Sequence, residues 1–319
     1  MTLEDLRVFA AVCEAHSLSA VARNLGCTQP AVGQHVARLE RELGVSLLDR
    51  RARGVSMTPA GEVLYRASVD ALGALSSASR HIGDIREGES GSLRISTGPT
   101  TVRHFMQSAV VRFRESFPGV ALEFRPRNST RGCLELLRRE PIDLAFVSTG
   151  MPSQGIEQRP VLEARLMLLL MADHTLAKRR RLRISDLENL SFVGLRSYTS
   201  PESQLAKQLA QHGLVIRSKT MVDDWDTAGM MVKLGMGAAI VPSVHAYSYM
   251  RSGQLAAVRI EGLSPVQFGW AARSFSALPK VAEHFMALVG KELEDADGLP
   301  GCRILRTAPT TPASKQRRA

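Results

Sequence analysis

Residues 17–50, SLSAVARNLGCTQPAVGQHVARLERELGVSLLDR, decide the fold of the N-terminal region, because they predict two helices joined by a glycine turn. Ala22 is small enough to let the helices cross closely, and Gly26 can adopt the positive φ that ends the first helix. Apolar residues are spaced to close a small core between the helices: Leu18, Leu25, Cys27, Val32 and Val36. This pattern predicts a helix-turn-helix, whose second helix enters the DNA major groove.

The flanking sequence completes this prediction. Residues 2–15 have the apolar spacing of an amphipathic helix, and Thr28 can cap a further helix that stops at Gly44. Residues 50–58 are short, basic and glycine-turned, as in a wing that lies over phosphates. A helix of about 27 residues, roughly 40 Å long, follows the Thr58-Pro59 start signal. One side of it is small and apolar, so we expect it to pair with a second copy.

The candidate DNA-binding residues lie on the second helix and the wing. They are Gln29, Gln34, His35, Arg38, Arg50, Arg51 and Arg53. An amide such as that of Gln29 can bond adenine bidentately, whereas the wing arginines are expected to hold phosphates. The alternative for the helix is an ordinary solvated face.

Composition bounds the function without deciding it. The net charge of +10 is not carried by this region, since residues 1–91 hold 10 Lys and Arg against 11 Asp and Glu. No apolar run is long enough to span a membrane, and the N-terminus lacks the features of a secretion signal. The four cysteines are isolated, so neither a zinc site nor a disulfide is expected, and a cytoplasmic location fits. No catalytic motif is found, so an enzyme is not expected.

Beyond residue 91 the pattern changes to alternating strands and helices. The alternation continues to residue 294 and predicts α/β architecture with mainly parallel sheets. Residues 295–319 lose this periodicity and are rich in Gly, Pro, Thr and Arg, so we expect a disordered tail. The predicted domains are therefore 1–58 for DNA binding, 59–90 as a linker helix, 91–294 as a second domain, and the tail.

The chain resembles the LysR-type transcriptional regulators. The resemblance rests on the helix-turn-helix block, on Thr58-Pro59-Ala60-Gly61, on PIDLAFV at 141–147 and on LGMGAAIVP at 234–242. It implies a winged helix-turn-helix, a dimerising linker helix and a two-lobed effector domain like that of periplasmic binding proteins. The sequence departs from the family at Gly33, where a serine is usual, and at Leu48, where phenylalanine is usual.

A two-lobed domain would bind its ligand beyond the carboxyl ends of strands, where helix N-termini offer free N–H groups. Polar loops at such places, which match the effector pocket of the family, supply the candidate effector-binding residues. They are Thr97, Thr100, Thr101, Ser148, Thr149, Arg196, Ser197, Thr199, Asp226 and Thr227. Hydroxyls, amides and Arg196 favour a small anion, although the acidic segment 223–226 leaves an amine-bearing ligand open. Helix capping is the alternative role for each residue.

The resulting hypothesis is a sequence-specific transcriptional regulator controlled by a small-molecule effector, with no cofactor and no metal. Expected partners are double-stranded DNA with an interrupted inverted repeat, further copies of the chain as dimer or tetramer, and RNA polymerase. The expected location is the nucleoid of a bacterial cytoplasm. A solute-binding protein of a transport system is the alternative, because it would use the same two-lobed domain. A thiol sensor is disfavoured, since Cys133 is the sole cysteine within the predicted effector domain.

Overall fold

A computed structural model describes residues 1–51, 54–86, 91–199, 203–295 and 301–305. The chain divides into two compact units. The first comprises residues 1–88 and the short stretch 135–142, and the second comprises residues 89–134 and 143–319. No helix in the described ranges is long and apolar enough to cross a membrane.

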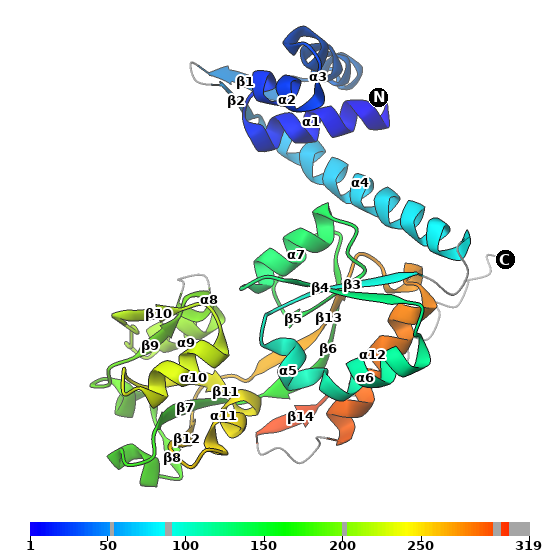
Figure 1. Ribbon diagram of the computed structural model, residues 1–319. Coiled ribbons are helices and arrows are strands. Elements are labelled where there is room, and N and C mark those ends of the chain that lie inside the picture. Colours follow the sequence, from blue (N-terminus) through cyan, green and yellow to red (C-terminus); the bar gives the residue numbers. More distant parts are fainter. Residues whose placement is uncertain (52–53, 87–90, 200–202, 296–300, 306–319) are drawn as a thin grey trace, which may run out of the picture. The chain divides into compact units, whose positions relative to one another are not determined.

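Three short helices form the core of the first unit (Figure 1). Helix α1 (Leu3–Ala15) starts at a capping box made by Thr2 and Asp5, and α2 (Leu18–Leu25) is capped by Ser17. Gly26 ends α2 with a φ of 64°. Helix α3 (Gln29–Leu43) is capped by Thr28 and stops at Gly44, as the sequence predicts. The capping signals therefore set the length of each helix.

The small core differs in part from the predicted one. Val32 and Val36 are buried as expected, together with residues of α1 such as Phe9 and Val12. The prediction was wrong for Leu25, which is 51% exposed, and for Cys27, which is also exposed. Both residues flank Gly26, and the left-handed turn there directs their side chains to solvent rather than between the helices.

The wing and the long helix follow. Strands β1 (Leu48–Arg51) and β2 (Gly54–Met57) pair antiparallel. Helix α4 (Pro59–Arg86) begins at Thr58, whose Oγ accepts from the Gly61 N–H at 3.0 Å. Gly61 is required by a close approach, because a Cβ there would lie 2.0 Å from the Leu47 carbonyl oxygen. The Thr-Pro-Ala-Gly start signal thus docks α4 on the chain segment before the wing.

The second unit is built from two lobes, each around its own sheet (Figure 1). Lobe I has a six-stranded sheet of order β14-β6-β13-β5-β3-β4. Its strands are β3 (Ser92–Thr97), β4 (Ala121–Pro126), β5 (Leu144–Ser148), β6 (Glu157–Ala164), β13 (Val266–Ala272) and β14 (Cys302–Ile304). Its helices are α5 (Thr101–Phe105), α6 (Gln107–Ser116) and α12 (Lys280–Asp295). Helix α7 (Thr130–Arg139) begins in this unit, and its second half belongs to the stretch 135–142 of the first unit. Phe113 of α6 and Phe285 of α12 meet Trp270 of β13 in the lobe's core.

Lobe II has a four-stranded sheet of order β11-β7-β12-β8 and the parallel pair β10-β9. Its strands are β7 (Leu166–Met171), β8 (Arg181–Leu182), β9 (Val193–Leu195), β10 (Thr220–Val222), β11 (Ala239–Pro242) and β12 (Leu255–Ile260). Its α-helices are α8 (Arg196–Thr199), α9 (Gln204–Gln211), α10 (Trp225–Lys233) and α11 (Ser243–Met250). Leucines of β7 pack on both faces of the sheet, Leu168 into one cluster and Leu169 into another.

The prediction of mainly parallel sheets was wrong. Parallel pairing holds for β3 with β4 and β5, but β13 runs antiparallel to both β5 and β6. Strand β7 likewise runs antiparallel to β11 and β12. The cause is that the chain passes from lobe I to lobe II at Arg165 and returns between Ile260 and Val266. At both crossings the chain enters the sheet of the other lobe directly, without the helix that a connection between parallel strands needs.

The prediction that residues 295–319 are disordered was also wrong for part of this segment. Residues Cys302–Ile304 form β14, which pairs antiparallel with residues Leu162–Ala164 of β6. The Arg165 N–H donates to the Gly301 carbonyl at 2.8 Å. A β-edge accepts a short strand through backbone hydrogen bonds alone, so the lack of sequence periodicity did not prevent pairing. Residues 296–300 and 306–319 of the predicted tail lie outside the described residues.

Candidate functional site

The first candidate site is the outer face of α3. Gln29, Gln34 and Arg38 are exposed on this helix, and His35 is half-buried. The Ser19 hydroxyl of α2 donates to the Gln29 Oε1 at 3.0 Å. Helix α2 therefore holds the Gln29 side-chain amide in place at the start of α3. The face therefore presents amide and guanidinium groups of the kind that read base edges and phosphates.

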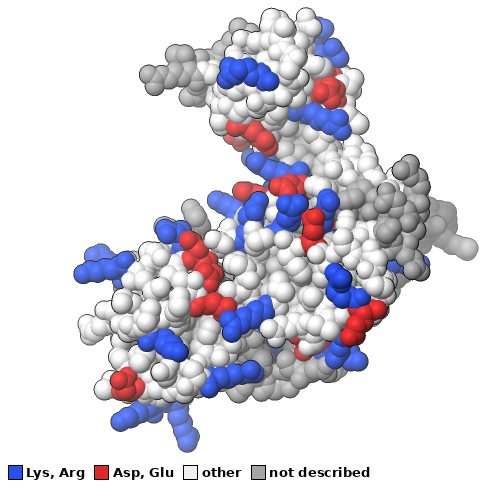
Figure 2. Space-filling view, in the orientation of Figure 1, with Lys and Arg blue, Asp and Glu red and all other residues white. Residues whose placement is uncertain are grey.

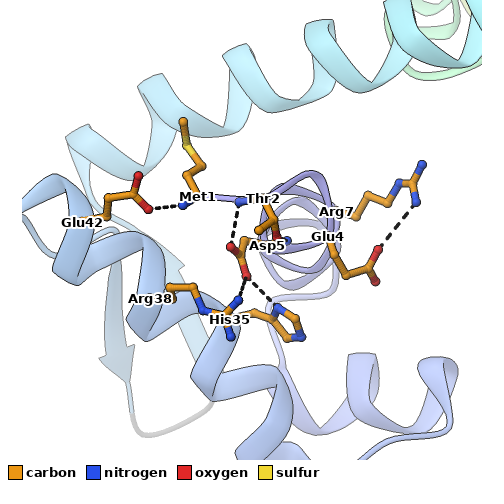
Figure 3. Close-up of polar contacts among 8 residues, drawn as sticks. All are labelled: Met1, Thr2, Glu4, Asp5, Arg7, His35, Arg38 and Glu42. Carbon is orange, nitrogen blue, oxygen red and sulfur yellow. Dashed lines mark hydrogen bonds and ion pairs between the residues drawn. The ribbon is translucent and has the colours of Figure 1, made fainter.

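Asp5 of α1 organises two of these residues (Figure 3). Its carboxylate is fully buried, and its Oδ1 lies 2.8 Å from His35 Nδ1 and 3.3 Å from the Arg38 guanidinium. The Thr2 N–H donates to the other oxygen at 2.8 Å. One carboxylate therefore joins the start of α1 to the middle of α3.

The hydrogen bonds to Asp5 outweigh the cost of burying it. Burial raises the pKa of this carboxyl, but the bonds from His35 and Thr2 and the charge of Arg38 lower it to about 2. Asp5 is therefore ionised and accepts the proton of His35 Nδ1, which leaves Nε2 of the ring for a contact outside the unit. His35 and Arg38 are thus pre-positioned by α1 rather than mobile on a solvated face.

The wing arginines are placed less fully. Arg50 and Arg51 belong to β1, whose pairing with β2 is described, but their side chains and the whole of Arg53 lie outside the described residues. Figure 2 shows Lys and Arg interspersed with Asp and Glu over the visible face rather than gathered in one continuous basic area. This agrees with the regional charge count and leaves α3 as the better-defined candidate surface.

The second candidate site is the set of polar loops in the effector domain, and several of its hydroxyls serve the backbone. Thr97 is buried and donates to the Phe146 carbonyl at 2.7 Å. Thr149 bonds Gln267, and Thr199 donates to the Leu195 carbonyl at 3.1 Å. Thr227 bonds Asp224, the cap of α10. For these four residues the alternative role, capping or bracing of the backbone, is the one that the structure gives.

Other predicted residues remain available for a ligand or bridge the lobes. Within the described residues, the hydroxyls of Thr100, Thr101 and Ser197 form no hydrogen bond with the protein. Arg196 pairs with Asp223 at 3.1 Å on the exposed surface of lobe II. Ser148 of lobe I lies 3.4 Å from the Tyr198 hydroxyl of lobe II. The hydroxyls at 100–101 and 197 are therefore not used by the described protein, although Thr100 is itself buried. The buried polar atom of this region that lacks a hydrogen bond within the described residues is His245 Nδ1.

Asp226 is already satisfied by the protein itself. Arg103 and His104 of α5, in lobe I, contact its two oxygens at 3.0 and 3.1 Å, and the Tyr249 hydroxyl of α11 donates at 2.7 Å. Burial raises the pKa of the Asp226 carboxyl, but the hydrogen bonds from Tyr249 and His104 lower it by more than burial raises it. The net pKa is therefore below its usual range. Asp226 is therefore an ionised residue that links the two lobes through Arg103 and His104 and is also held by Tyr249, as well as a predicted ligand residue. We call this set of contacts the latch.

Aromatic rings fill the space beside this latch. The His104 and His245 rings are in tilted contact, with centroids 4.4 Å apart and an interplanar angle of 53°. The Trp225 ring contacts the rings of Tyr198 and His245, at centroid distances of 4.6 and 5.4 Å. Burial lowers the pKa of His104, although its bond to Asp226 opposes the change. Burial also lowers the pKa of His245 well below its usual value, so this ring is neutral. The lobes thus meet through neutral imidazoles and aromatic rings.

Besides Arg103 and His104, the partners of Asp226 in lobe I, sequence reasoning missed five residues of these sites: Asp5, Tyr198, Trp225, His245 and Tyr249. Asp5 could have been found, because Thr2-x-x-Asp5 has the spacing of a capping box. No local pattern distinguishes the other four from core residues. The described part of the chain holds no cluster of three or more His, Cys, Asp or Glu side chains arranged for a metal ion.

Comparison with known proteins covers both units. Residues 3–62 match the bacterial regulatory helix-turn-helix protein, lysR family, and residues 86–294 match the LysR substrate binding domain. A probable RuBisCO transcriptional regulator of Thalassiosira pseudonana is 28% identical over 76% of this chain and 81% of its own length. The HTH-type transcriptional activator CmpR of Synechocystis is 26% identical over 84% of this chain and 88% of its own.

Solved structures agree in fold. A Corynebacterium glutamicum OxyR C206 mutant has 26% identity and a TM-score of 0.56, and 92% of each chain is covered. Full-length BenM, at 21% identity and a TM-score of 0.56 over 94% of this chain and 99% of its own, shares the fold. The helix-turn-helix, the two-lobed domain and both family matches lead to one conclusion: this chain belongs to the LysR family of transcriptional regulators.

Proposed function

We propose that this regulator binds an interrupted inverted-repeat operator as a dimer, with a small-molecule effector controlling the bound state. The observation that carries the proposal is helix α3, where Asp5 holds His35 and Arg38 in place and where the side chains of Gln29 and Gln34 are exposed. A fixed polar helix face costs little ordering entropy when it binds DNA. Two copies would place two such helices in successive major grooves.

Helix α4 supports the dimer. Two of its apolar residues, Leu75 and Ile82, lie seven positions apart on one face and are 45% and 67% exposed in the single chain, and Val63 on a neighbouring face is 70% exposed. Exposed apolar residues spaced along one long helix are typical of a surface that another helix covers. A second copy of α4 is the simplest partner, and pairing of two dimers would give a tetramer. The further expected partner is RNA polymerase, and the place of action is the nucleoid of the cytoplasm.

A small anion is the proposed effector class. Thr100, Thr101 and Ser197 leave hydroxyls without protein partners, and the α5 backbone begins at the same loop. Hydroxyls and free N–H groups suit a carboxylate or phosphate. No cofactor or metal is part of the proposed mechanism. Binding between the lobes would favour one lobe arrangement over another and so change the geometry of the paired DNA-binding units.

Footprinting on the region upstream of the protein's own gene tests the DNA proposal. The double variant Gln29→Ala with Arg38→Ala should weaken specific binding by at least about tenfold, since each lost contact of this kind is worth about 1–3 kcal/mol. Arg7→Ala is the matched control, because Arg7 is an exposed arginine of α1. An unchanged footprint in the double variant would refute the assignment of α3.

A thermal-shift screen tests the effector proposal separately. Small carboxylates, amino acids and aromatic acids are added to the full chain, and a true effector should raise Tm in a saturable manner. Thr100→Val and Ser197→Ala should each reduce that rise, because they remove the hydroxyls that have no protein partner. If only cationic amines stabilise the protein, the anion class is wrong, while the DNA proposal is unaffected.

A further inference from the structure

A pocket of about 570 Å³ lies between α10 and α11 of lobe II and reaches α5 of lobe I. The residues that decide its chemistry are Arg103, Asp226, Lys233, Arg251 and Ser248. None of the polar loops predicted to bind the effector, at 97–101, 148–149 and 196–199, lines it. Apart from Asp226, this pocket is therefore separate from the proposed effector cleft.

The lining has an excess of positive charge. It holds three cations, Arg103, Lys233 and Arg251, against the single carboxylate of Asp226. That carboxylate is already shared among Arg103, His104 and Tyr249. In the described part of the chain, Lys233 and Arg251 form no ion pair. Two exposed cations therefore line one pocket without an ion pair to a described protein anion.

We propose that this pocket binds a small dianion, either a phosphate group or a dicarboxylate. Such a ligand gains charge-assisted hydrogen bonds from Lys233 and Arg251, and the Ser248 hydroxyl adds a neutral donor. The pocket is open to water, so the ligand keeps part of its hydration and the affinity is moderate. This site goes beyond the proposed function, which places an effector at the polar loops.

Arg103 couples the pocket to the lobes. Its guanidinium belongs to lobe I, contacts Asp226 of lobe II at 3.0 Å and also lines the pocket. A dianion bound beside it competes with Asp226 for the same guanidinium. The Arg103–Asp226 pair weakens, while the His104 and Tyr249 bonds to Asp226 remain. Anion binding thus loosens one of the contacts between the lobes without breaking the latch.

Binding is tested on the full chain with inorganic phosphate and with succinate, at constant ionic strength maintained with NaCl. Trp225 precedes Asp226 and is one of only two tryptophans, so ¹⁹F NMR of fluorotryptophan-labelled protein gives a local signal. A saturable shift of the Trp225 resonance is expected. The double variant Lys233→Ala with Arg251→Ala should raise the dissociation constant by about tenfold or more, since two charge-assisted hydrogen bonds are lost.

The matched control removes the same charges elsewhere on lobe II. Arg217→Ala with Lys219→Ala replaces an exposed arginine and an exposed lysine that do not line the pocket, and should leave the titration unchanged. Equal weakening in both double variants, or a linear shift without saturation, would overturn the site as a general salt effect. Saturation by phosphate and not succinate, or the reverse, would identify which dianion fits.

Arg103→Gln tests the coupling. This variant should already place the Trp225 resonance near its anion-bound position, and phosphate should then move it by much less than in the parent protein. A full phosphate shift in Arg103→Gln would contradict competition for this guanidinium. Footprinting without added anion is the readout that separates this result from a failure of the DNA proposal, because operator binding does not require the pocket.

Discussion

At the scale of the residue, Gly33 lowers the free energy of unfolding of the first unit relative to an alanine at this position. It lies inside α3, and a Cβ built there meets no atom within 4 Å. Gly33→Ala should therefore stabilise the first unit by about 1 kcal/mol, because alanine restricts the unfolded chain and favours helix. Hydrogen-exchange protection of α3 measures this. Gly26→Ala is the control and should destabilise, since its φ of 64° strains any Cβ. A destabilised Gly33→Ala would contradict the prediction.

Asp5 predicts an acid transition of the first unit. Its pKa is lowered from 3.8 to about 2, so the unfolded state takes up the proton first. The carboxylate therefore contributes about 2 kcal/mol above pH 4, and this contribution is lost as the pH falls from about 4 to 2. Hydrogen exchange of α1 and α3 across that range measures the loss. Asp5→Asn should flatten the profile, and an equally steep profile in that variant would refute the role of Asp5.

Residue-scale prediction from sequence succeeded where the signal was local. Thr28 and Gly44 set the ends of α3 because capping depends on neighbouring residues alone. The contact between Asp5 and His35 joins residues 30 positions apart, and only the packing of α1 on α3 creates it. The same holds for Asp226, whose partners come from two lobes. Candidate residues could be named from the sequence, but their internal partners could not.

At the scale of the element, β14 shows why strand order escaped prediction. Alternation of strands and helices predicted an α/β domain over residues 91–294, but strand direction within a sheet depends on where the chain passes between the lobes. Strands β6 and β13 pass at the same boundary and run antiparallel, and β14 joins the free edge of β6. Its three residues match no periodic pattern, so only the available edge explains the pairing.

Truncation tests the contribution of β14. A chain ending at Asp295 loses the backbone pairing with β6, the Arg165 bond to Gly301 and the Arg303–Glu163 pair at 3.0 Å. We expect the free energy of unfolding of the second unit to fall by about 1–3 kcal/mol, since each net hydrogen bond contributes about 1 kcal/mol. The Tm of this unit should be lower as a result. A chain ending at Leu305 is the matched control and should keep the parent Tm. Equal Tm values for both truncations would contradict the structural role of β14.

At the scale of the whole molecule, the two units should respond to acid in different ranges. In the second unit, burial lowers the pKa of His104 and, more strongly, of His245 from their usual 6.5. These rings stay neutral in the folded state at a pH where unfolded imidazoles are protonated. Folding stability therefore falls as the pH drops below about 6.5. The first unit has its Asp5 transition only below pH 4, so the effector domain should loosen first.

The two tryptophans make this difference measurable in the intact chain. Trp225 and Trp270 both lie in the second unit, so their fluorescence during urea unfolding reports that unit alone. Between pH 6.5 and 5 the free energy of unfolding should fall, and each extra proton bound on unfolding steepens the slope by about 1.4 kcal/mol per pH unit. His245→Phe removes one such proton and should reduce the slope, even if the variant is less stable overall. His212→Phe, at an exposed histidine of lobe II, is the control and should keep the parent slope. A slope unchanged in His245→Phe would mean that the buried ring at the lobe boundary does not cause the acid sensitivity.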